Sequence, residues 1–184
     1  MAKIAIFLAD GFEEVEAFAP VDILRRGGMD VTMVSIMGRK QVNGSHGIDV
    51  QADILLEELD FDSMDMLILP GGKQGTENLR NCTQLHEKLR EFDEAGKYIA
   101  AICAAPTVFG QLGLLKGKCA TCYGGLEDKL TGATTLTEPV VVDGHTITSR
   151  GMGTSIQFGL KLLEIFTDAA TAKKMAQTVM MPQA

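Results

Sequence analysis

Three short apolar runs, at 3–9, 66–69 and 98–102, constrain the fold of this chain more than any other feature. Each run is about as long as a strand, and such continuous apolar runs are typical of parallel strands covered on both faces. The first run is followed by a helical spacing of apolar residues over 12–26. This alternation predicts an α/β fold, a mostly parallel open sheet with helices on both faces.

The rest of the chain continues the alternation, and an Asp143-Gly144 pair adds a hairpin signal. We expect strands at 31–36, 118–122, 140–142 and 146–149, an edge segment at 48–52, helices at 83–95 and 106–112, and two closing helices. A chain of 184 residues can bury one substantial core but is short for two domains. The sequence therefore predicts a single domain over 1–184.

The charge and hydropathy patterns exclude several classes of partner. A net charge of −7 and a pI near 4.9 argue against nucleic acid, because affinity for phosphates depends on clustered Lys and Arg. No run approaches the roughly 20 apolar residues that span a bilayer, so we expect no membrane partner. The first residues lead directly into an apolar run without a cleavable signal pattern. We expect a cytoplasmic protein with reduced cysteines.

Cys103 stands where the third apolar run gives way to a helix. In a doubly wound sheet the ligand crevice lies at the carboxyl ends of the strands. A thiol there lies near free backbone N–H groups and the positive end of a helix dipole, which both favour the thiolate. Its small neighbours Ala101, Ala104 and Ala105 leave room for a sharp turn. From position alone, a buried structural cysteine is an equal alternative.

Glu16 is the second candidate, because it shares a helical stripe with the apolar residues Phe12 and Ile23. Burial would raise the pKa of its carboxyl, so that Glu16 could hold a proton and donate it to a thiolate. Glu13 and Glu14 suit the helix N-terminus instead. Periodicity alone favours the alternative, in which Glu16 lies on an ordinary solvated face.

Other motifs give weaker signals. Gly71-Gly72 after the second run either presents N–H groups to an oxyanion or forms a simple turn. Cys119 and Cys122 have a C-x-x-C spacing, but within a strand they would point to opposite faces, and no second ligand pair completes a metal site. Gly151-Met-Gly153 lacks the third glycine of a dinucleotide site. We expect no metal, and solvent-exposed histidines at the three positions His46, His86 and His145.

Four motifs occur together over nearly the whole chain: Gly11-Phe-Glu-Glu-Val-Glu16, Leu69-Pro-Gly-Gly72, Ala100-Ala-Ile-Cys-Ala-Ala-Pro106 and Thr148-Ser-Arg-Gly-Met-Gly-Thr154. In this order and spacing they resemble the DJ-1/PfpI family, specifically its DJ-1/ThiJ branch. The resemblance implies a flavodoxin-like α/β sandwich, usually a homodimer. It also implies that Cys103 is the reactive thiol, that Glu16 is its protonated partner, and that Gly71, Gly72 and Ala104 supply N–H donors to an oxyanion.

The resemblance also implies a range of activities. Family members are described as cofactor-independent glyoxalases that convert methylglyoxal to lactate, and as deglycases of glycated protein or nucleotide. We therefore expect a small aldehyde or dicarbonyl substrate, or a glycated protein, and no cofactor. The alternative is a non-enzymatic oxidative-stress sensor or protective chaperone that uses the same cysteine. A role in thiamine biosynthesis or proteolysis is less favoured. Proteolysis is disfavoured because Ala104 stands where the protease branch has a histidine.

The sequence departs from the animal members at two positions. Tyr123 stands where they carry a histidine near the thiol, and His46 stands where they carry an anion-binding arginine. A tyrosine, with an ordinary pKa of about 10, is a poor general base near neutral pH. Proton transfer would therefore fall mainly to Glu16. We count Tyr123, His46 and Arg26 as secondary candidates for the site.

Overall fold

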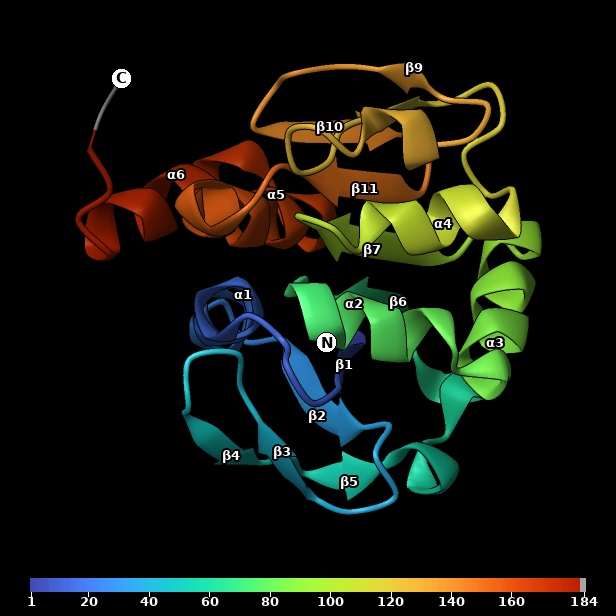
Figure 1. Cartoon of the computed structure of the whole chain (residues 1–184). Coiled ribbons are helices and arrows are strands. Elements are labelled where there is room, and N and C mark those ends of the chain that lie inside the picture. Colours follow the sequence, from blue (N-terminus) through green and yellow to red (C-terminus); the bar gives the residue numbers. More distant parts are fainter. Residues whose placement is uncertain (183–184) are drawn as a thin grey trace.

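The computed structural model describes residues 1–182 and has a seven-stranded sheet at its centre (Figure 1). All neighbouring strands of this sheet are parallel except the β10–β11 hairpin. In order across the sheet, the strands are β10 (Val140–Asp143), β11 (Thr146–Ser149), β7 (Tyr98–Ile102), β6 (Met66–Leu69), β1 (Lys3–Leu8), β2 (Asp30–Ser35) and β5 (Ile54–Leu55). The predicted α/β class and mostly parallel sheet are confirmed.

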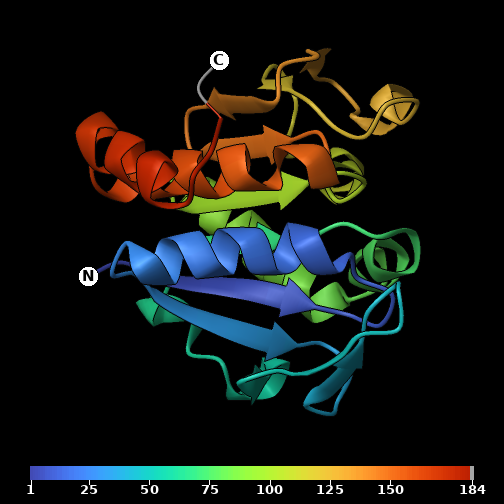
Figure 2. The same cartoon turned by 90° about the vertical axis from the view of Figure 1, so that its left-hand side faces the viewer.

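Helices cover both faces of the sheet (Figures 1 and 2). One face carries α1 (Glu14–Arg26), α5 (Ser155–Phe166) and α6 (Ala169–Thr178). The other carries α2 (Lys73–Arg80), α3 (Thr83–Glu94) and α4 (Pro106–Leu112). Within residues 1–182, every helix is too short or too polar to span a lipid bilayer.

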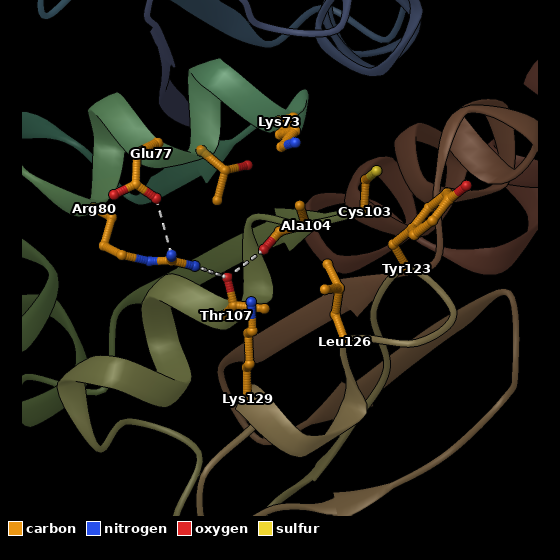
Figure 3. A pocket seen from close by; sticks show the side chains of 10 residues that line it. Lys73, Glu77, Arg80, Cys103, Ala104, Thr107, Tyr123, Leu126 and Lys129 are labelled. Atoms are coloured by element: carbon orange, nitrogen blue, oxygen red, sulfur yellow. Dashed lines mark hydrogen bonds and ion pairs between the residues drawn. The ribbon is translucent and has the colours of Figure 1, made fainter.

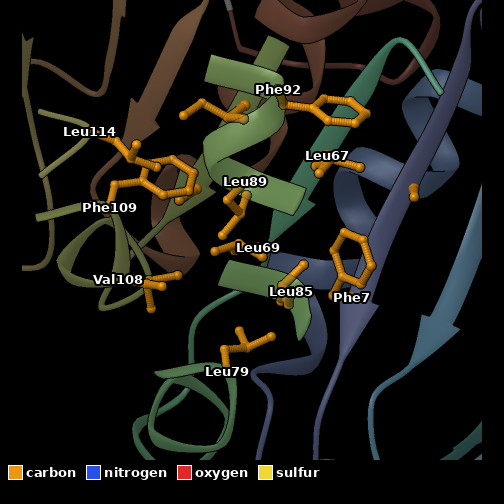
Figure 4. Close-up of a cluster of buried hydrophobic side chains, with 14 of the residues drawn as sticks. Phe7, Leu67, Leu69, Leu79, Leu85, Leu89, Phe92, Val108, Phe109 and Leu114 are labelled. Atoms are coloured by element: carbon orange, nitrogen blue, oxygen red, sulfur yellow. The ribbon is translucent and has the colours of Figure 1, made fainter. Parts of the chain in front are cut away.

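Two hydrophobic cores lie on opposite sides of the sheet, because successive side chains of a strand point to opposite faces. On β1, Ile4 and Ile6 pack beneath α1 and α5, whereas Ala5 and Phe7 pack beneath α3 and α4. Figure 4 shows the core beneath α3 and α4, with Phe7 beside leucines of β6 and α3. The continuous apolar runs of the sequence are explained by this burial on both faces.

The sequence suggested an edge strand at 48–52, but this segment is not part of the main sheet. Instead, β4 (Asp49–Gln51) pairs with β3 (Gln41–Asn43) in a separate two-stranded sheet. The edge position belongs to β5, which follows β4 directly. A further small sheet pairs β8 (Cys119–Ala120) with β9 (Thr134–Thr135).

Helix α2 was not predicted, because its sequence, KQGTENLR, contains one large apolar residue, Leu79, and a glycine. Leu79 is fully buried in the core beneath α3 and α4, and this contact anchors the helix. Short 3₁₀ helices are added at Leu56–Glu58, Phe61–Ser63, Glu127–Lys129 and Met152–Thr154. The carboxyl ends of β6 and β7 thus lead directly into α2 and a turn before α4, and this edge of the sheet holds the candidate site.

Candidate active site

Cys103 follows β7 directly and occupies a strained turn. Its φ is +65°, and among the described residues it shares a positive φ only with Met180 and with glycines. This conformation costs a side-chain-bearing residue about 1 kcal/mol or more. The Cys103 N–H donates to the Ser149 carbonyl (2.9 Å), and the Tyr123 N–H donates to the Cys103 carbonyl (2.7 Å). The backbone on both sides therefore holds the thiol at the end of the strand.

Glu16 reaches the thiol from the first turn of α1, where Glu13 caps the helix by accepting from the Glu16 N–H (2.7 Å). The Glu16 side chain is buried, and its Oε2 accepts from the Gly71 N–H at 3.1 Å. Its carboxyl lies beside the Cys103 thiol, and hydrogen bonding between the two groups affects the pKa of both. The expected pairing of Glu16 with Cys103 is thus present, and the solvated-face alternative is wrong.

Gly71 has to be a glycine for this pair to form. A Cβ added at Gly71 would lie 2.6 Å from the Cys103 Cβ and would overlap the Glu16 carboxylate. A side chain on residue 71 would therefore separate the acid from the thiol. The glycine after β6 is explained by this close approach and not by the turn alone.

Burial raises the pKa of Glu16 to about 7, and the nearby charge of Glu13 adds to this effect. The hydrogen bond with Cys103 and the N–H groups of Gly71 and Met152 act in the opposite direction. A carboxyl with a pKa near 7 is suited to exchange protons under physiological conditions. The raised pKa that the sequence suggested for Glu16 is confirmed.

Burial also raises the pKa of Cys103, to about 12, and the charge and hydrogen bond of Glu16 add to this effect. The N–H groups of Gly72 and Ala104 lower it, but they do not compensate. The expectation that nearby N–H groups and the helix dipole would favour the thiolate is therefore wrong for the pKa of Cys103. Two groups that interact this strongly titrate as a pair, so between about pH 7 and pH 12 they share one proton. The sulfur is anionic whenever that proton resides on Glu16.

The N–H donors at the site differ from the expected set. The Gly71 N–H is engaged by Glu16, whereas the N–H groups of Gly72 and Ala104 are directed at the Cys103 sulfur. An oxyanion formed on a group bound to the sulfur would therefore meet the N–H groups of Gly72 and Ala104. The Gly71 N–H is already used by Glu16. Of the three expected donors, Gly72 and Ala104 are available.

A cavity of about 490 Å³ opens beside the thiol (Figure 3). Its size is within the range of small-molecule sites, about 300–1,000 Å³. Tyr123 lines it next to Cys103, and this residue is more than half exposed. The lining residues are Lys73, Thr76, Glu77, Arg80, Cys103, Ala104, Thr107, Tyr123, Leu126 and Lys129.

Two of the secondary candidates lie away from this cavity. Arg26 is at the far end of α1 from Glu16 and forms an ion pair with Asp22 at 2.6 Å. The His46 ring is exposed, as expected, and its Nδ1 lies 2.8 Å from Glu14 Oε2. Neither lines the cavity.

The other two histidines are tied to the protein, and one differs from the prediction. His86 is buried on α3, with Nε2 placed 3.0 Å from the Leu79 carbonyl. The prediction of an exposed ring is wrong there, because the ring satisfies a carbonyl at the end of α2. His145 is partly buried, with Nε2 placed 2.7 Å from Asp93.

Potential metal ligands gather at one place among residues 1–182, where ligand atoms of Glu13, Glu14 and His46 lie within 4.8 Å of one another. The Glu14 oxygens already accept from the His46 N–H (2.7 Å) and the Ser45 hydroxyl (3.1 Å). These contacts within the chain satisfy the buried carboxylate without an ion. At the C-x-x-C pair, Cys119 is partly buried and Cys122 is fully buried in the core beneath α4.

Several site residues were not recognised in the sequence. The Met152 N–H lowers the pKa of Glu16, and a Cβ placed on Gly151 would lie 4.0 Å from the Cys103 sulfur. The glycines of this segment were the available signal, although they do not form a dinucleotide site. Lys73 and Arg80 were missed together with α2, on which both lie.

Comparison with known proteins identifies relatives of this chain. The family model described as "DJ-1/PfpI family" matches residues 2–165. "Protein DJ-1 homolog B" of Arabidopsis thaliana is 43% identical over 88% of this chain, which spans only 37% of that protein. "Deglycase TK1284" of Thermococcus kodakarensis is 34% identical over 82% of this chain and 91% of its own length.

A solved structure of oxidised DJ-1 from Toxoplasma gondii has a TM-score of 0.95 and 33% identity, with 100% of both chains covered. The flavodoxin-like sandwich that the motifs implied is thereby confirmed. Because the family model covers most of the chain and the fold agrees from end to end, this protein belongs to the DJ-1/PfpI family.

Proposed function

We propose that this protein is a cofactor-independent glyoxalase or deglycase that acts on reactive dicarbonyls, with Cys103 as nucleophile and Glu16 as acid and base. The proposal rests on the buried Glu16 carboxyl beside Cys103, whose thiol lines the cavity. A relative named as a deglycase, at 34% identity, supports the same class of chemistry.

The first step forms a carbon–sulfur bond. The Cys103 thiolate, with the shared proton on Glu16, adds to the aldehyde carbon of methylglyoxal. The carbonyl oxygen becomes an oxyanion near the N–H groups of Gly72 and Ala104, and it takes up a proton to give a neutral hemithioacetal. Because burial raises its pKa to about 7, Glu16 can both give and accept protons here.

The second step moves a hydrogen within the substrate. Glu16 removes the proton from the former aldehyde carbon and returns a proton to the neighbouring ketone carbon, through an enediol. The first carbon is thereby oxidised to a thioester and the second is reduced to an alcohol, so no external oxidant or reductant is needed. Water then cleaves the thioester, and lactate and the free thiol are released.

The test is lactate release from methylglyoxal by the wild type and by three variants, Cys103→Ala, Glu16→Gln and Glu14→Gln. We expect Cys103→Ala to have no activity above background and Glu16→Gln to lose roughly 10²-fold or more in kcat, the usual range for a general acid–base. Glu14→Gln is the matched control, since it is the same substitution at a buried position of α1 whose partners are His46 and Ser45. Undiminished turnover in Cys103→Ala or Glu16→Gln would refute this mechanism.

An oxidation sensor is the second candidate function. The same Gly72 and Ala104 N–H groups and a protonated Glu16 would stabilise a sulfinate on Cys103. A related Toxoplasma gondii DJ-1 has been solved in an oxidised form. If Cys82, Cys119 or Cys122 oxidises before Cys103 under graded peroxide, measured by mass spectrometry, the sensor function fails.

The homodimer that the motifs imply stays a prediction, which sedimentation analysis would test.

A further inference from the structure

The wall of the cavity around Cys103 and Tyr123 is cationic. Lys73, Arg80 and Lys129 line it, and Glu77 is the one acidic residue beside them (Figure 3). The chain as a whole has the opposite balance, with 24 acidic and 17 basic residues. Positive charge is therefore concentrated at this cavity against the net charge of the protein.

Arg80 is held in place by two contacts. Its Nη1 donates to Glu77 Oε2 at 3.0 Å, and its Nη2 donates to the Thr107 hydroxyl at 2.7 Å. That hydroxyl donates in turn to the Ala104 carbonyl at 2.7 Å, one residue from Cys103. A guanidinium has five N–H donors, so Arg80 keeps further donors for a ligand while its orientation is fixed.

The two lysines have no such partners. No ion pair within residues 1–182 includes Lys73 or Lys129. Both side chains are exposed at the cavity and come from different elements, α2 and the 3₁₀ helix at Glu127–Lys129. Unpaired cations around a cavity attract anions and raise their local concentration.

From this arrangement we propose that Arg80, assisted by Lys73 and Lys129, selects substrates that carry a carboxylate or phosphate group in addition to the reactive carbonyl. The inference rests on the proposed function for the reacting end of the substrate. The anionic end would lie at the Arg80–Thr107 corner while the carbonyl carbon meets the Cys103 sulfur. The cavity, at about 490 Å³, is much larger than a three-carbon dicarbonyl requires and leaves room for this second group.

The test compares two alkylating agents of nearly the same shape, iodoacetate and iodoacetamide, at Cys103. In each reaction the sulfur bonds to the methylene carbon and iodide leaves, so only the charge of the reagent differs. We expect the ratio of the iodoacetate rate to the iodoacetamide rate to fall about 3- to 10-fold in Arg80→Gln, and by a similar factor in Lys73→Gln/Lys129→Gln. The double variant removes no ion pair, so its fold is not at risk.

The matched control is Lys173→Gln/Lys174→Gln, which removes the same charge from exposed positions of α6 on the other face of the sheet. Its rate ratio should equal that of the wild type. An unchanged ratio in both cavity variants, or an equal fall in the control, would overturn the proposal.

Protection experiments identify the anion. Inorganic phosphate and acetate are added separately as competitors of iodoacetamide at Cys103. Stronger protection by phosphate assigns phosphorylated carbonyls, and equal or stronger protection by acetate assigns carboxylates. Protection by neither anion would count against the site.

Alkylation requires the Cys103 sulfur but not catalytic turnover. The glyoxalase proposal and the anion-selection proposal can therefore be refuted independently. A charge-dependent ratio without lactate release from methylglyoxal would refute the glyoxalase proposal alone. Normal lactate release with no charge dependence would refute the anion selection alone.

Discussion

Glu14 and Glu16 stand two residues apart in the first turn of α1, are both buried, and have opposite acid–base properties. Burial pushes the pKa of Glu14 upward, but hydrogen bonds from His46 and Ser45 outweigh it and lower the pKa to about 2. Burial raises the pKa of Glu16 to about 7, and its partners, a thiol and N–H groups, do not reverse this. Partners rather than burial therefore decide which carboxyl is structural and which can exchange a proton.

The largest expected effect is on how stability varies with pH. Glu14 has a folded pKa below its ordinary value of 4.5, so its contribution is present above about pH 4.5 and is lost as the pH falls towards 2. Glu16 has a folded pKa above 4.5, so the folded state binds its proton more tightly and stability declines as the pH rises from about 4.5 to 7. Each shift corresponds to roughly 3 to 4 kcal/mol at most.

Denaturant unfolding of Glu14→Gln and Glu16→Gln between pH 3 and pH 8 measures this difference. We expect Glu14→Gln to lose stability relative to the wild type above pH 4.5 and to approach it in acid. The stability of Glu16→Gln relative to the wild type should instead increase between pH 4.5 and pH 7. Parallel curves for the two variants would show that the two carboxyls do not differ as described.

The second effect concerns the reactivity of Cys103. If the proton shared by the pair resides on Glu16, alkylation by iodoacetamide should reach half its maximal rate near pH 7 in the wild type. In Glu16→Gln the thiol has no carboxyl to which it can pass the shared proton, so burial should hold this midpoint at least a unit above 7, a loss of roughly 10-fold in rate at pH 7. Glu14→Gln should match the wild type.

Mass spectrometry that resolves Cys103 from the other thiols makes this measurement, with Cys122 as an internal reference. Burial raises the pKa of Cys122 to about 11, and it has no carboxyl partner comparable to Glu16. A wild-type midpoint near 12 would place the shared proton on the sulfur and contradict the proposed nucleophile.

The smallest effect is expected for Ser45, whose hydroxyl donates to Glu14. Ser45→Ala removes one hydrogen bond to Glu14 Oε2 and should lower the free energy of unfolding by about 0.5–1 kcal/mol without changing lactate release. Ser155→Ala is a suitable control, because the buried Ser155 hydroxyl has no hydrogen-bond partner within the described residues. An unchanged free energy of unfolding in Ser45→Ala would show that its hydrogen bond does not stabilise the ionised Glu14.

Much of the fold could be predicted because burial on both faces leaves a local signature. The ranges 98–102, 106–112 and 146–149 agree with β7, α4 and β11 residue for residue. Helix α2 could not be found, since a single buried leucine on eight residues gives too weak a periodicity. The cations on α2 were missed for the same reason.

The sequence by itself determined that a cysteine would stand at the end of a buried parallel strand and that a glutamate would lie in the first turn of a neighbouring helix. Only the tertiary structure decided their protonation, because a pKa depends on burial and on partners that are distant in the chain. Gly71 is 55 residues from Glu16, yet it supplies the N–H and the space that the Glu16–Cys103 pair needs. The cationic wall likewise exists only because folding brings α2 and the segment at Glu127–Lys129 to the same cavity.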